Sequence, residues 1–392
     1  AGAVVALAVL ANLATTGVVA RRTRGALAPL GEAHALLAPL RRLLALYGAA
    51  DVRAPAWAAL RPALVDGERA LARLERLASW AEVRNSPLAH LALNATLAWD
   101  AQLLARLAGW RAAHAAATPR WRDALSEAEA LVALGTLAHD HPDWAFPTVV
   151  DDDPDDGHAD GHADGHADGH ADGGATVVAE SLAHPLLAAA TRVGNAVRLG
   201  GPGSVLVVSG ANMAGKTTYL RAIGVNVLLA LVGGPVCARS MRLRRVRVAT
   251  SIGIRDALGD GVSLFLAELR RLQAIVAAAA RPDAPPVLYL LDEVLHGTNS
   301  RDRRTATRAV LAHLRRHGAV GLVTTHDLEL ADDPSLAAAA THRHFQEGWA
   351  RAAGPDGGAL RMTFDYVARP GPATGSNALA LLAALGLAAP GQ

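Results

Sequence analysis

Hydrophobic residues follow two different patterns along the chain. From residue 26 to about 140 the sequence is rich in Ala, Leu and Arg, and leucines recur at helical spacing, as at Leu71, Leu74 and Leu77. Beyond residue 175, helical stretches alternate with short apolar runs, among them SVLVVS at 204–209, PVLYLL at 286–291 and GLVTT at 321–325. Uninterrupted runs of this length are typical of strands buried in a parallel sheet. The pattern predicts an all-α domain over residues 21–150 and an α/β domain with a mostly parallel sheet over 175–370.

Prolines and tryptophans recur along the helical half. The leucine stripes fit the core of a helical bundle. Prolines are expected to divide it into several helices, at Pro55, Pro62, Pro87 and Pro119. Five tryptophans are expected to anchor the packing, with a platform for stacking nucleic-acid bases as the alternative: Trp57, Trp80, Trp99, Trp110 and Trp121.

The first twenty residues carry no charged side chain. Residues 1–20 contain eight Val or Leu residues, and Arg21, Arg22 and Arg24 follow directly. An apolar segment with such a basic flank is typical of a transmembrane helix whose flank faces the cytoplasm. We expect a span that tethers the cytoplasmic remainder of the chain to the inner membrane, with a buried helix as the alternative. A signal peptide is disfavoured, because its basic residues would precede the apolar segment.

A low-complexity segment separates the two halves. Residues 151–174 begin with DDDPDD and continue with four GHAD repeats. The repeats place four histidines at intervals of four residues, at His158, His162, His166 and His170. Helical spacing would align their imidazoles, but a glycine in every repeat disfavours a helix. We expect a disordered, solvated linker at the domain boundary, and weak metal binding by the histidines is the alternative.

The linker masks a basic excess in the rest of the chain. Lys and Arg number 38 against 36 Asp and Glu, a net charge of +2. Nine of the acids are aspartates between 151 and 172, so 27 acids face 38 basic residues elsewhere, an excess of eleven positive charges. A protein surface with this excess can approach a polyanion.

The single cysteine, Cys237, excludes a disulfide within the chain, and we expect it to be a small core residue.

A glycine-rich loop follows the first apolar run. GANMAGKT at 210–217 leads into a helical stretch that ends near Leu231. Strand, glycine loop and helix are the context of a phosphate-binding loop (P-loop), whose backbone N–H groups surround the β-phosphate of a nucleotide. Lys216 would contact the β- and γ-phosphates, and the Thr217 hydroxyl would ligate Mg²⁺. Lys216 is the only lysine beside 37 arginines, which indicates a position that requires a slim ammonium. The residues predicted to bind ATP are Gly210, Ala211, Asn212, Met213, Ala214, Gly215, Lys216, Thr217 and Thr218.

Two further apolar runs end in candidate catalytic side chains. Asp292 and Glu293 follow the run at 286–291. We expect Asp292 to hold Mg²⁺ through water and Glu293 to act as general base toward the attacking water. His326 follows the run at 321–325, where it would sense or orient groups around the γ-phosphate; a surface or capping histidine is the alternative.

Four motifs together resemble the ATPase domain of the MutS family of DNA mismatch repair proteins. They are GANMAGKTTYLRAIG at 210–224, DGVSLF at 260–265, LLDEVLHGTNSRD at 290–302 and TTHD at 324–327. The resemblance extends to ESLAHP at 180–185 and to RPGPA at 369–373 with Ser376. It covers roughly residues 175–388, and weakly the helical region before them, which would match core and lever helices. It implies a P-loop ATPase of the ABC/MutS type that uses ATP and Mg²⁺, forms a homodimer through the ATPase domain and binds DNA.

The resemblance implies further roles for single residues. Ser263 matches the family's signature serine, which reaches across a dimer to the partner's γ-phosphate, and His326 matches its switch histidine. Residues 371–392 would form a helical dimerisation tail. The loop that crosses the dimer interface would comprise Gly297, Thr298, Asn299, Ser300 and Asp302. The chain departs from the family pattern, without losing a phosphate or metal ligand, at Ala211 in place of Pro, Thr217 in place of Ser, and Leu295-His296 in place of Gly-Arg.

The region before residue 151 is too short for the family's mismatch-reading domains. About 150 residues cannot hold an N-terminal domain with a Phe-x-Glu wedge, a connector domain and core helices, and no Phe-x-Glu sequence occurs before residue 151. We expect a truncated MutS-related branch that hydrolyses ATP and couples turnover to gripping or releasing DNA, in mismatch repair or related DNA maintenance. The arginines of the helical region and of 242–247 are expected to contact DNA phosphates.

Two rival interpretations share part of this pattern. Transporter-type and chromosome-maintenance ATPases share the loop and the Asp-Glu strand, but the LSGGQ-like signature that they carry does not occur in the sequence. A membrane-tethered scaffold that binds nucleotide without turnover is the other alternative. Glu293 disfavours it, because a protein that only binds nucleotide needs no base beside the metal carboxylate.

Overall fold

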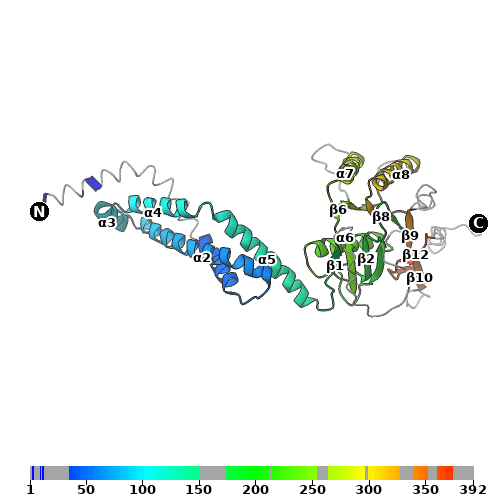
Figure 1. Ribbon diagram of the computed structural model, residues 1–392, viewed down its shortest axis with the longest axis horizontal. Helices are drawn as coiled ribbons and strands as arrows, with labels where there is room; N and C mark the ends of the chain where they lie inside the picture. The colour runs from blue at the N-terminus through cyan, green and yellow to red at the C-terminus, as the bar shows by residue number, and fades with distance from the viewer. Residues whose placement is uncertain are drawn as a thin grey trace, which may run out of the picture. The chain divides into compact units, whose positions relative to one another are not determined.

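The computed structural model describes residues 2–3, 9, 11–12, 35–150, 174–211, 213–253, 264–295, 299–326, 339–351 and 360–373. The chain divides into two compact units, residues 1–133 and 134–392 (Figure 1). Within the described residues, no helix combines the length and the apolar character needed to cross a bilayer. Most of the span predicted at residues 1–20, and the linker from 151 to 173, lie outside the described residues.

Helices make up the described part of the first unit. Residues 35–49 are helical. They are followed by α2 Pro55–Ala81, the 3₁₀ turn η1 Glu82–Asn85, α3 Pro87–Leu97, α4 Trp99–His114 and α5 Thr118–Asp140, the last of which ends within the second unit. Leu64, Leu103 and Ala128 lie at the centre of their shared core. The all-α architecture predicted for this half of the chain is confirmed.

Prolines begin helices in this unit more often than they interrupt them. Pro55 and Pro87 are the first residues of α2 and α3, where the missing N–H would have no helical partner. Pro62 lies inside α2, so the break predicted there is wrong. Around it Leu60 and Leu64 are buried, and their packing offsets the lost hydrogen bond and steric clash, which cost about 3 kcal/mol.

The tryptophans of the first unit lie at different depths. Trp57 and Trp121 are buried in the core, and the indole N–H of Trp110 donates to the Ala70 carbonyl at 2.8 Å. These side chains anchor the helices, as expected. Trp80 is 41% exposed and lies at the surface.

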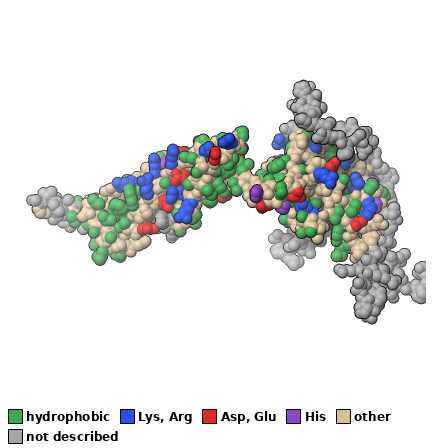
Figure 2. Space-filling model, turned by 90° about the horizontal axis from the view of Figure 1, so that it is seen from below, with side chains coloured by type: hydrophobic (Ala, Val, Ile, Leu, Met, Phe, Trp, Pro, Cys, Tyr) green, Lys and Arg blue, Asp and Glu red, His purple; other side chains and the backbone are tan. Residues whose placement is uncertain are grey.

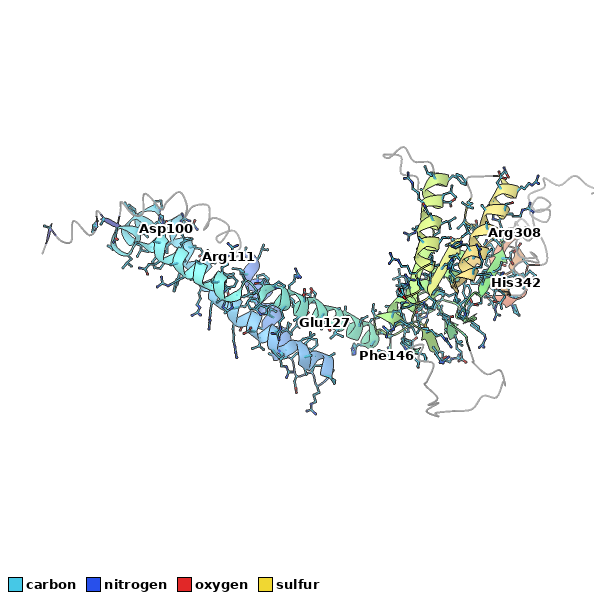
Figure 3. All side chains as sticks on the ribbon, turned by 45° about the horizontal axis from the view of Figure 1, so that its top comes forward. Asp100, Arg111, Glu127, Phe146, Arg308 and His342 are labelled. Carbon is cyan, nitrogen blue, oxygen red and sulfur yellow. The ribbon has the colours of Figure 1, made fainter. Side chains whose placement is uncertain are left out.

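A buried carboxylate fixes the corner between α3 and α4. Asp100, in the first turn of α4, is 4% exposed (Figure 3). One of its oxygens lies 3.0 Å from His90 Nε2 and the other 3.7 Å from an Arg84 nitrogen. Its backbone N–H donates to Asn94 Oδ1 at 2.9 Å. These partners offset the cost of removing the carboxylate from water.

A six-stranded sheet organises the second unit, in the order β12-β9-β4-β8-β7-β6. All neighbouring strands are parallel except β12 and β9. The strands are β4 Val205–Gly210, β6 Arg247–Ser251, β7 Val287–Asp292, β8 Val320–Thr324, β9 Ala340–Phe345 and β12 Arg369–Pro370. The α/β class and mostly parallel sheet predicted from the sequence are confirmed.

Helices cover both faces of this sheet. Helix α6 Lys216–Leu231 packs on one face, and α7 Leu264–Ala279 and α8 Ser300–Arg316 pack on the other (Figure 1). Successive residues of one strand therefore enter different cores: Leu206 and Val208 contact the α6 side, and Val205 and Val207 the opposite side. Because both faces are buried, the central strands are apolar throughout.

A second sheet, not predicted from the sequence, lies beside the first and shares its α6 core. Its order is β1-β5-β2-β3, with β2 antiparallel to both neighbours and β1 parallel to β5. The strands are β1 Thr148–Val150, β2 Val177–Leu182, β3 Asn195–Leu199 and β5 Ser240–Arg244; a separate hairpin pairs β10 Glu347–Arg351 with β11 Leu360–Phe364. The connection between β2 and β3, residues 183–194, reaches the candidate site described below.

The residues after α5 pack against this part of the unit. Trp144, Ala183 and Cys237 form a small buried cluster, so Cys237 is a free core cysteine, as expected. Arg192 joins the same cluster: its guanidinium lies 2.8 Å from Asp143 and 5.7 Å from the centre of the Trp144 ring. The connection 183–194 is thereby tied to the segment that leads out of α5.

Candidate functional site

The glycine-rich loop connects β4 to α6. Gly210 ends the strand with φ 137°, and Gly215, with φ 109°, precedes the first residue of α6. These are conformations that side chains other than glycine rarely adopt. A Cβ on Gly210 would lie 2.6 Å from the Phe345 carbonyl oxygen, so the close approach of β9 also requires glycine. The strand, loop and helix order expected of a P-loop is present.

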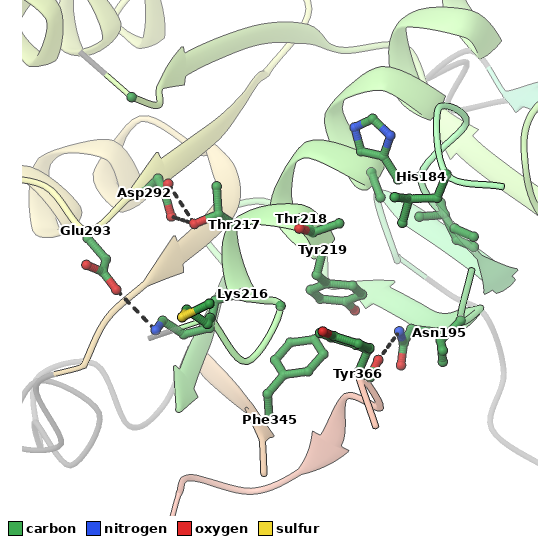
Figure 4. Close-up of a pocket in the computed structure, with 18 of the residues that line it drawn as sticks. His184, Asn195, Lys216, Thr217, Thr218, Tyr219, Asp292, Glu293, Phe345 and Tyr366 are labelled. Carbon is green, nitrogen blue, oxygen red and sulfur yellow. Dashed lines mark hydrogen bonds and ion pairs between the residues drawn. The ribbon is translucent and has the colours of Figure 1, made fainter. Parts of the chain in front are cut away.

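The ammonium of Lys216 is buried at the centre of this loop. Its side chain is only 4% exposed, and Nζ donates to the carbonyl oxygens of Gly210 at 2.9 Å and Ala211 at 3.0 Å. Nζ also lies 3.1 Å from Glu293 Oε1 (Figure 4). Three acceptors offset the cost of removing the charge from water. The loop is therefore wrapped around a fixed positive charge.

Asp292 lies across from the first turn of α6. The Thr217 hydroxyl donates to the Asp292 carboxylate, 3.0 Å from each oxygen, and the Thr324 hydroxyl donates to Oδ1 at 2.7 Å. The carboxylate is thus oriented from both sides, at the carboxyl ends of β7 and β8. Threonine and aspartate oxygens are the hard ligands that Mg²⁺ prefers, with phosphate oxygens and water completing its shell.

Glu293 follows in a strained backbone conformation. Its φ is 43°, in the left-handed region, and its N–H donates to Thr324 Oγ1 at 3.0 Å. This turn directs the carboxylate back toward the loop, where Oε1 meets Lys216 and Oε2 lies 3.7 Å from His326 Nδ1. Strain at such a position is typical of functional sites. Lys216, Glu293 and His326 are therefore brought together.

The other predicted P-loop residues differ in exposure. Ala214 is buried and Met213 is 85% exposed at the mouth of the loop, with φ 69°. Thr218 and Met213 line the cavity described next. Asn212, Ser263, Gly297 and Thr298 lie outside the described residues.

Part of the predicted interface loop forms the start of α8. Asn299 is the N-cap of this helix, and its side-chain oxygen accepts from the Asp302 N–H at 2.9 Å. The Asn299 amide also donates to the Asp302 carboxylate at 2.6 Å. Asparagine is among the preferred residues at this position, so a local helix-capping role accounts for both side chains.

A cavity of about 1030 Å³ opens beside the P-loop (Figure 4). Its polar end is lined by Lys216, Thr217, Asp292 and Glu293. Its other end is lined by three aromatic rings, those of Tyr219, Phe345 and Tyr366. The cavity is large enough for a nucleotide, with charges at one end and apolar surface at the other.

Asn195 of β3 fixes the backbone on both sides of Val367, next to Tyr366. Its amide donates to the Tyr366 carbonyl at 3.0 Å and accepts from the Ala368 N–H at 2.7 Å. The rings of Tyr219 and Phe345 meet edge to face, with centres 5.7 Å apart, and Tyr366 is 46% exposed to the cavity and solvent. Asn195, Phe345 and Tyr366 come from separate segments that form no contiguous motif, so the sequence does not identify them. Tyr219 lies within the motif at 210–224 but was assigned no role there.

His184 lies at the rim of the cavity, in the connection 183–194. Its Nδ1 accepts from the Leu186 N–H at 3.2 Å, an interaction that requires Nδ1 to be unprotonated. Burial, and secondarily the nearby charge of Arg221, lower the pKa of the His184 imidazole below its ordinary value. The four linker histidines lie outside the described residues, and within those residues no group of three or more His, Cys, Asp or Glu side chains could hold a metal ion.

Comparison with known proteins places the similarity in the second half of the chain. Residues 206–385 match the family model of MutS domain V. Proteins named DNA mismatch repair protein MutS 2 are 37% identical over 190 residues, in Halobacterium salinarum, and 37% identical over 172 residues, in Haloarcula marismortui. DNA mismatch repair protein MutS of Chloroflexus aurantiacus is 33% identical over 159 residues.

These alignments cover 47%, 43% and 39% of this chain and 20%, 17% and 15% of the respective relatives. The chain thus matches a fifth or less of the length of the relatives, and the similarity is partial.

Proposed function

Because residues 206–385 belong to the MutS domain V family, an ATPase domain, we propose that this protein binds ATP with Mg²⁺ in the cavity beside the P-loop and hydrolyses it to ADP and phosphate. One observation carries the proposal: Lys216, Thr217, Asp292 and Glu293 converge at one end of a cavity of nucleotide size. These are the charge, the metal ligands and the base that phosphoryl transfer to water requires.

The phosphates bind at the N-terminus of α6. Backbone N–H groups of the loop and the positive end of the helix dipole favour negative charge there, and Lys216 adds a full positive charge. Thr217 and Asp292 supply oxygen ligands to Mg²⁺, which neutralises phosphate charge when bound. Both side chains are already held in mutual contact, so little reorganisation is needed.

Glu293 accepts the proton of the attacking water. Its Oε1 contacts the Lys216 ammonium at 3.1 Å. A bound phosphate that contacts the same ammonium competes for it, and Oε1 of Glu293 then becomes available as a proton acceptor. His326, 3.7 Å from Oε2, orients the carboxylate. The water then attacks the γ-phosphorus, and ADP leaves.

The adenine base packs at the aromatic end of the cavity. The Tyr366 ring, which is 46% exposed, offers the stacking surface, while Tyr219 and Phe345 line the cavity from the core. Asn195 bonds the backbone on both sides of Val367 and so determines where the Tyr366 ring lies.

We further propose a homodimer that couples ATP turnover to gripping or releasing DNA. Three observations support this: the match of Ser263 and of the loop at 297–302 to the family pattern, the names of the relatives, and the Arg192 contacts. Arg192 joins the connection that lines the cavity to Asp143 and Trp144, which follow α5. Movement of that connection on nucleotide binding would thus reach the helix that enters the first unit.

Phosphate release by the purified chain tests the ATPase proposal. We expect ATP hydrolysis that requires Mg²⁺. If a dimer is the active species, the rate should rise more steeply than linearly with chain concentration. The rate should also change when duplex, mismatched or branched DNA is added at stated salt. ATP binding without phosphate release under any of these conditions would contradict it and favour a nucleotide-binding scaffold.

Mixing two inactive variants tests the dimer. If Ser263 acts on the partner's nucleotide, a Ser263→Ala chain mixed with a Lys216→Ala chain forms heterodimers in which one site carries both defects and the other carries neither. We expect activity to recover in part. No recovery, in a mixture shown to exchange subunits, would contradict an action across the dimer.

A further inference from the structure

A basic groove runs between α2 and α4 of the helical unit. It has a volume of about 400 Å³, and its lining contains three arginines and two tryptophans but, among the described residues, no acidic side chain. The arginines are Arg73 and Arg76 of α2 and Arg106 of α4, and the tryptophans are Trp80 and Trp110. Basic side chains gather in clusters along this unit on the face seen in Figure 2.

Among the described residues, no acidic side chain compensates the charges of this groove. No hydrogen bond or ion pair joins the side chain of Arg73 or Arg76 to another described residue. Arg106 donates only to the uncharged side chain of Gln102 and lies over the Trp80 ring, 5.6 Å from its centre. The acidic side chains nearest in sequence on α2, Glu68 and Glu75, are both paired with Arg41.

The spacing of the arginines suits a row of phosphates. Arg69, exposed one turn before Arg73, extends the row on α2, so that Arg69, Arg73 and Arg76 span about 10 Å along the helix axis. One DNA strand carries a phosphate for each rise of about 3.4 Å, so the row covers about three steps between successive phosphates. A concave groove fits a strand better than the flat surface of a bilayer, and the half-exposed Trp80 ring offers apolar contact to a sugar or base.

We propose that this groove binds the phosphate backbone of DNA. The inference rests on the proposed function in that DNA is the partner, and it assigns the contact to the helical unit and not to the ATPase domain. Arg73, Arg76 and Arg106 each contact a phosphate, and binding relieves their mutual repulsion.

Two triple variants of equal charge test the proposal. The groove variant is Arg73→Gln, Arg76→Gln and Arg106→Gln. The control is Arg53→Gln, Arg120→Gln and Arg122→Gln, which removes the same charge from positions outside the groove lining. All six side chains are exposed, so both variants should fold, as thermal melting will verify. Binding of the full chain to a short fluorescent duplex is measured by anisotropy over a salt series without nucleotide, with ATP hydrolysis in parallel.

We expect the groove variant to bind at least about tenfold more weakly at low salt, with a slope of log K against log[salt] reduced by about 0.9 for each lost phosphate contact. The control should bind within about twofold of the parent. Equal weakening of both variants would overturn the proposal, because general charge would then explain binding. Binding to anionic vesicles but not to duplex, lost in the groove variant, would overturn it in favour of a lipid surface.

The parallel assay separates this inference from the ATPase proposal. A parent chain that hydrolyses ATP but binds no duplex would overturn the groove and leave the ATPase standing. A parent that binds duplex through the groove but hydrolyses no ATP would support the groove and contradict the ATPase.

Discussion

The two ends of the nucleotide cavity are built in different ways. At the phosphate end, Asp292 ends β7 and Lys216 begins α6. Lys216 lies 3.1 Å from Glu293, and the Thr217 hydroxyl donates to Asp292 at 3.0 Å. At the base end, three rings from separate segments line the cavity, and one asparagine fixes the backbone at Tyr366. Charges held in a desolvated site act more strongly than ring contacts. The phosphate end should therefore decide whether a nucleotide binds and reacts, and the base end which nucleotide is preferred.

The strongest challenge to this comparison is Lys216→Ala. Loss of the buried ammonium should weaken ATP binding at least about 30-fold, since truncating one partner of a buried charge pair costs about 2–5 kcal/mol. Calorimetric titration with Mg-ATP measures it. Arg239→Ala, which removes an exposed positive charge from the same unit, should leave affinity unchanged. Unchanged affinity in Lys216→Ala would contradict the P-loop assignment.

Glu293→Gln should separate reaction from binding. The amide keeps the shape of the side chain but accepts no proton, so single-turnover hydrolysis should fall about 10² to 10⁴-fold while ATP affinity stays within a few-fold of the parent. His326→Ala should reduce the rate less, because His326 acts through the carboxylate. Hydrolysis by Glu293→Gln at the parent rate would mean that another group is the base.

The phosphate end could be predicted from the sequence because its geometry is local. A loop between a strand and a helix needs glycine at 210 and 215, a lysine at 216 and an oxygen ligand at 217, all within eight residues. The sequence assigned Thr217 and Asp292 separately to Mg²⁺. Their contact agrees with the rule that ligand sites form at the carboxyl ends of parallel strands. The contact of Glu293 with Lys216 could not be foreseen, because it depends on the left-handed turn at Glu293.

The base end and the second sheet depend on tertiary structure. Any large apolar residue can line a pocket for a base, so Phe345 and Tyr366 carry no spacing signal. Asn195 looks like an ordinary polar residue at the start of β3 until the chain returns, about 170 residues later, to place Tyr366 beside it. The helical half shows the same limit. Its helices could be predicted from hydrophobic periodicity, but Pro62 lies inside α2 because of tertiary packing, which the local sequence does not reveal.

Tyr366→Ala should produce an intermediate effect. Loss of one stacking ring should weaken ATP binding about tenfold, within the range of about 1–3 kcal/mol for base–aromatic contacts. Binding of inorganic tripolyphosphate, which has no base, should be unaffected, and Tyr366→Phe should retain ATP affinity because the ring remains. Equal weakening of ATP and tripolyphosphate would show that Tyr366 supports the phosphate end, and the contrast between the two ends would fail.

The smallest expected effect is a pH dependence at the rim of the base end. The pKa of His184 is lowered in the folded protein by burial and by Arg221, so below the ordinary histidine pKa of about 6.5 the unfolded chain binds more protons than the folded one. The free energy of unfolding should therefore fall as pH drops below about 6.5, and level off once the pH is below the folded pKa. His184→Gln should remove this part of the loss, which we expect to be a melting-temperature change of at most about 3 °C. His317→Gln, at the exposed end of α8, serves as the control.

Protonation of His184 also removes the acceptor for the Leu186 N–H. This should loosen the rim and weaken ATP binding slightly at acid pH, relative to the binding of tripolyphosphate. An acid-induced loss of stability that is identical in the parent and in His184→Gln would contradict this role.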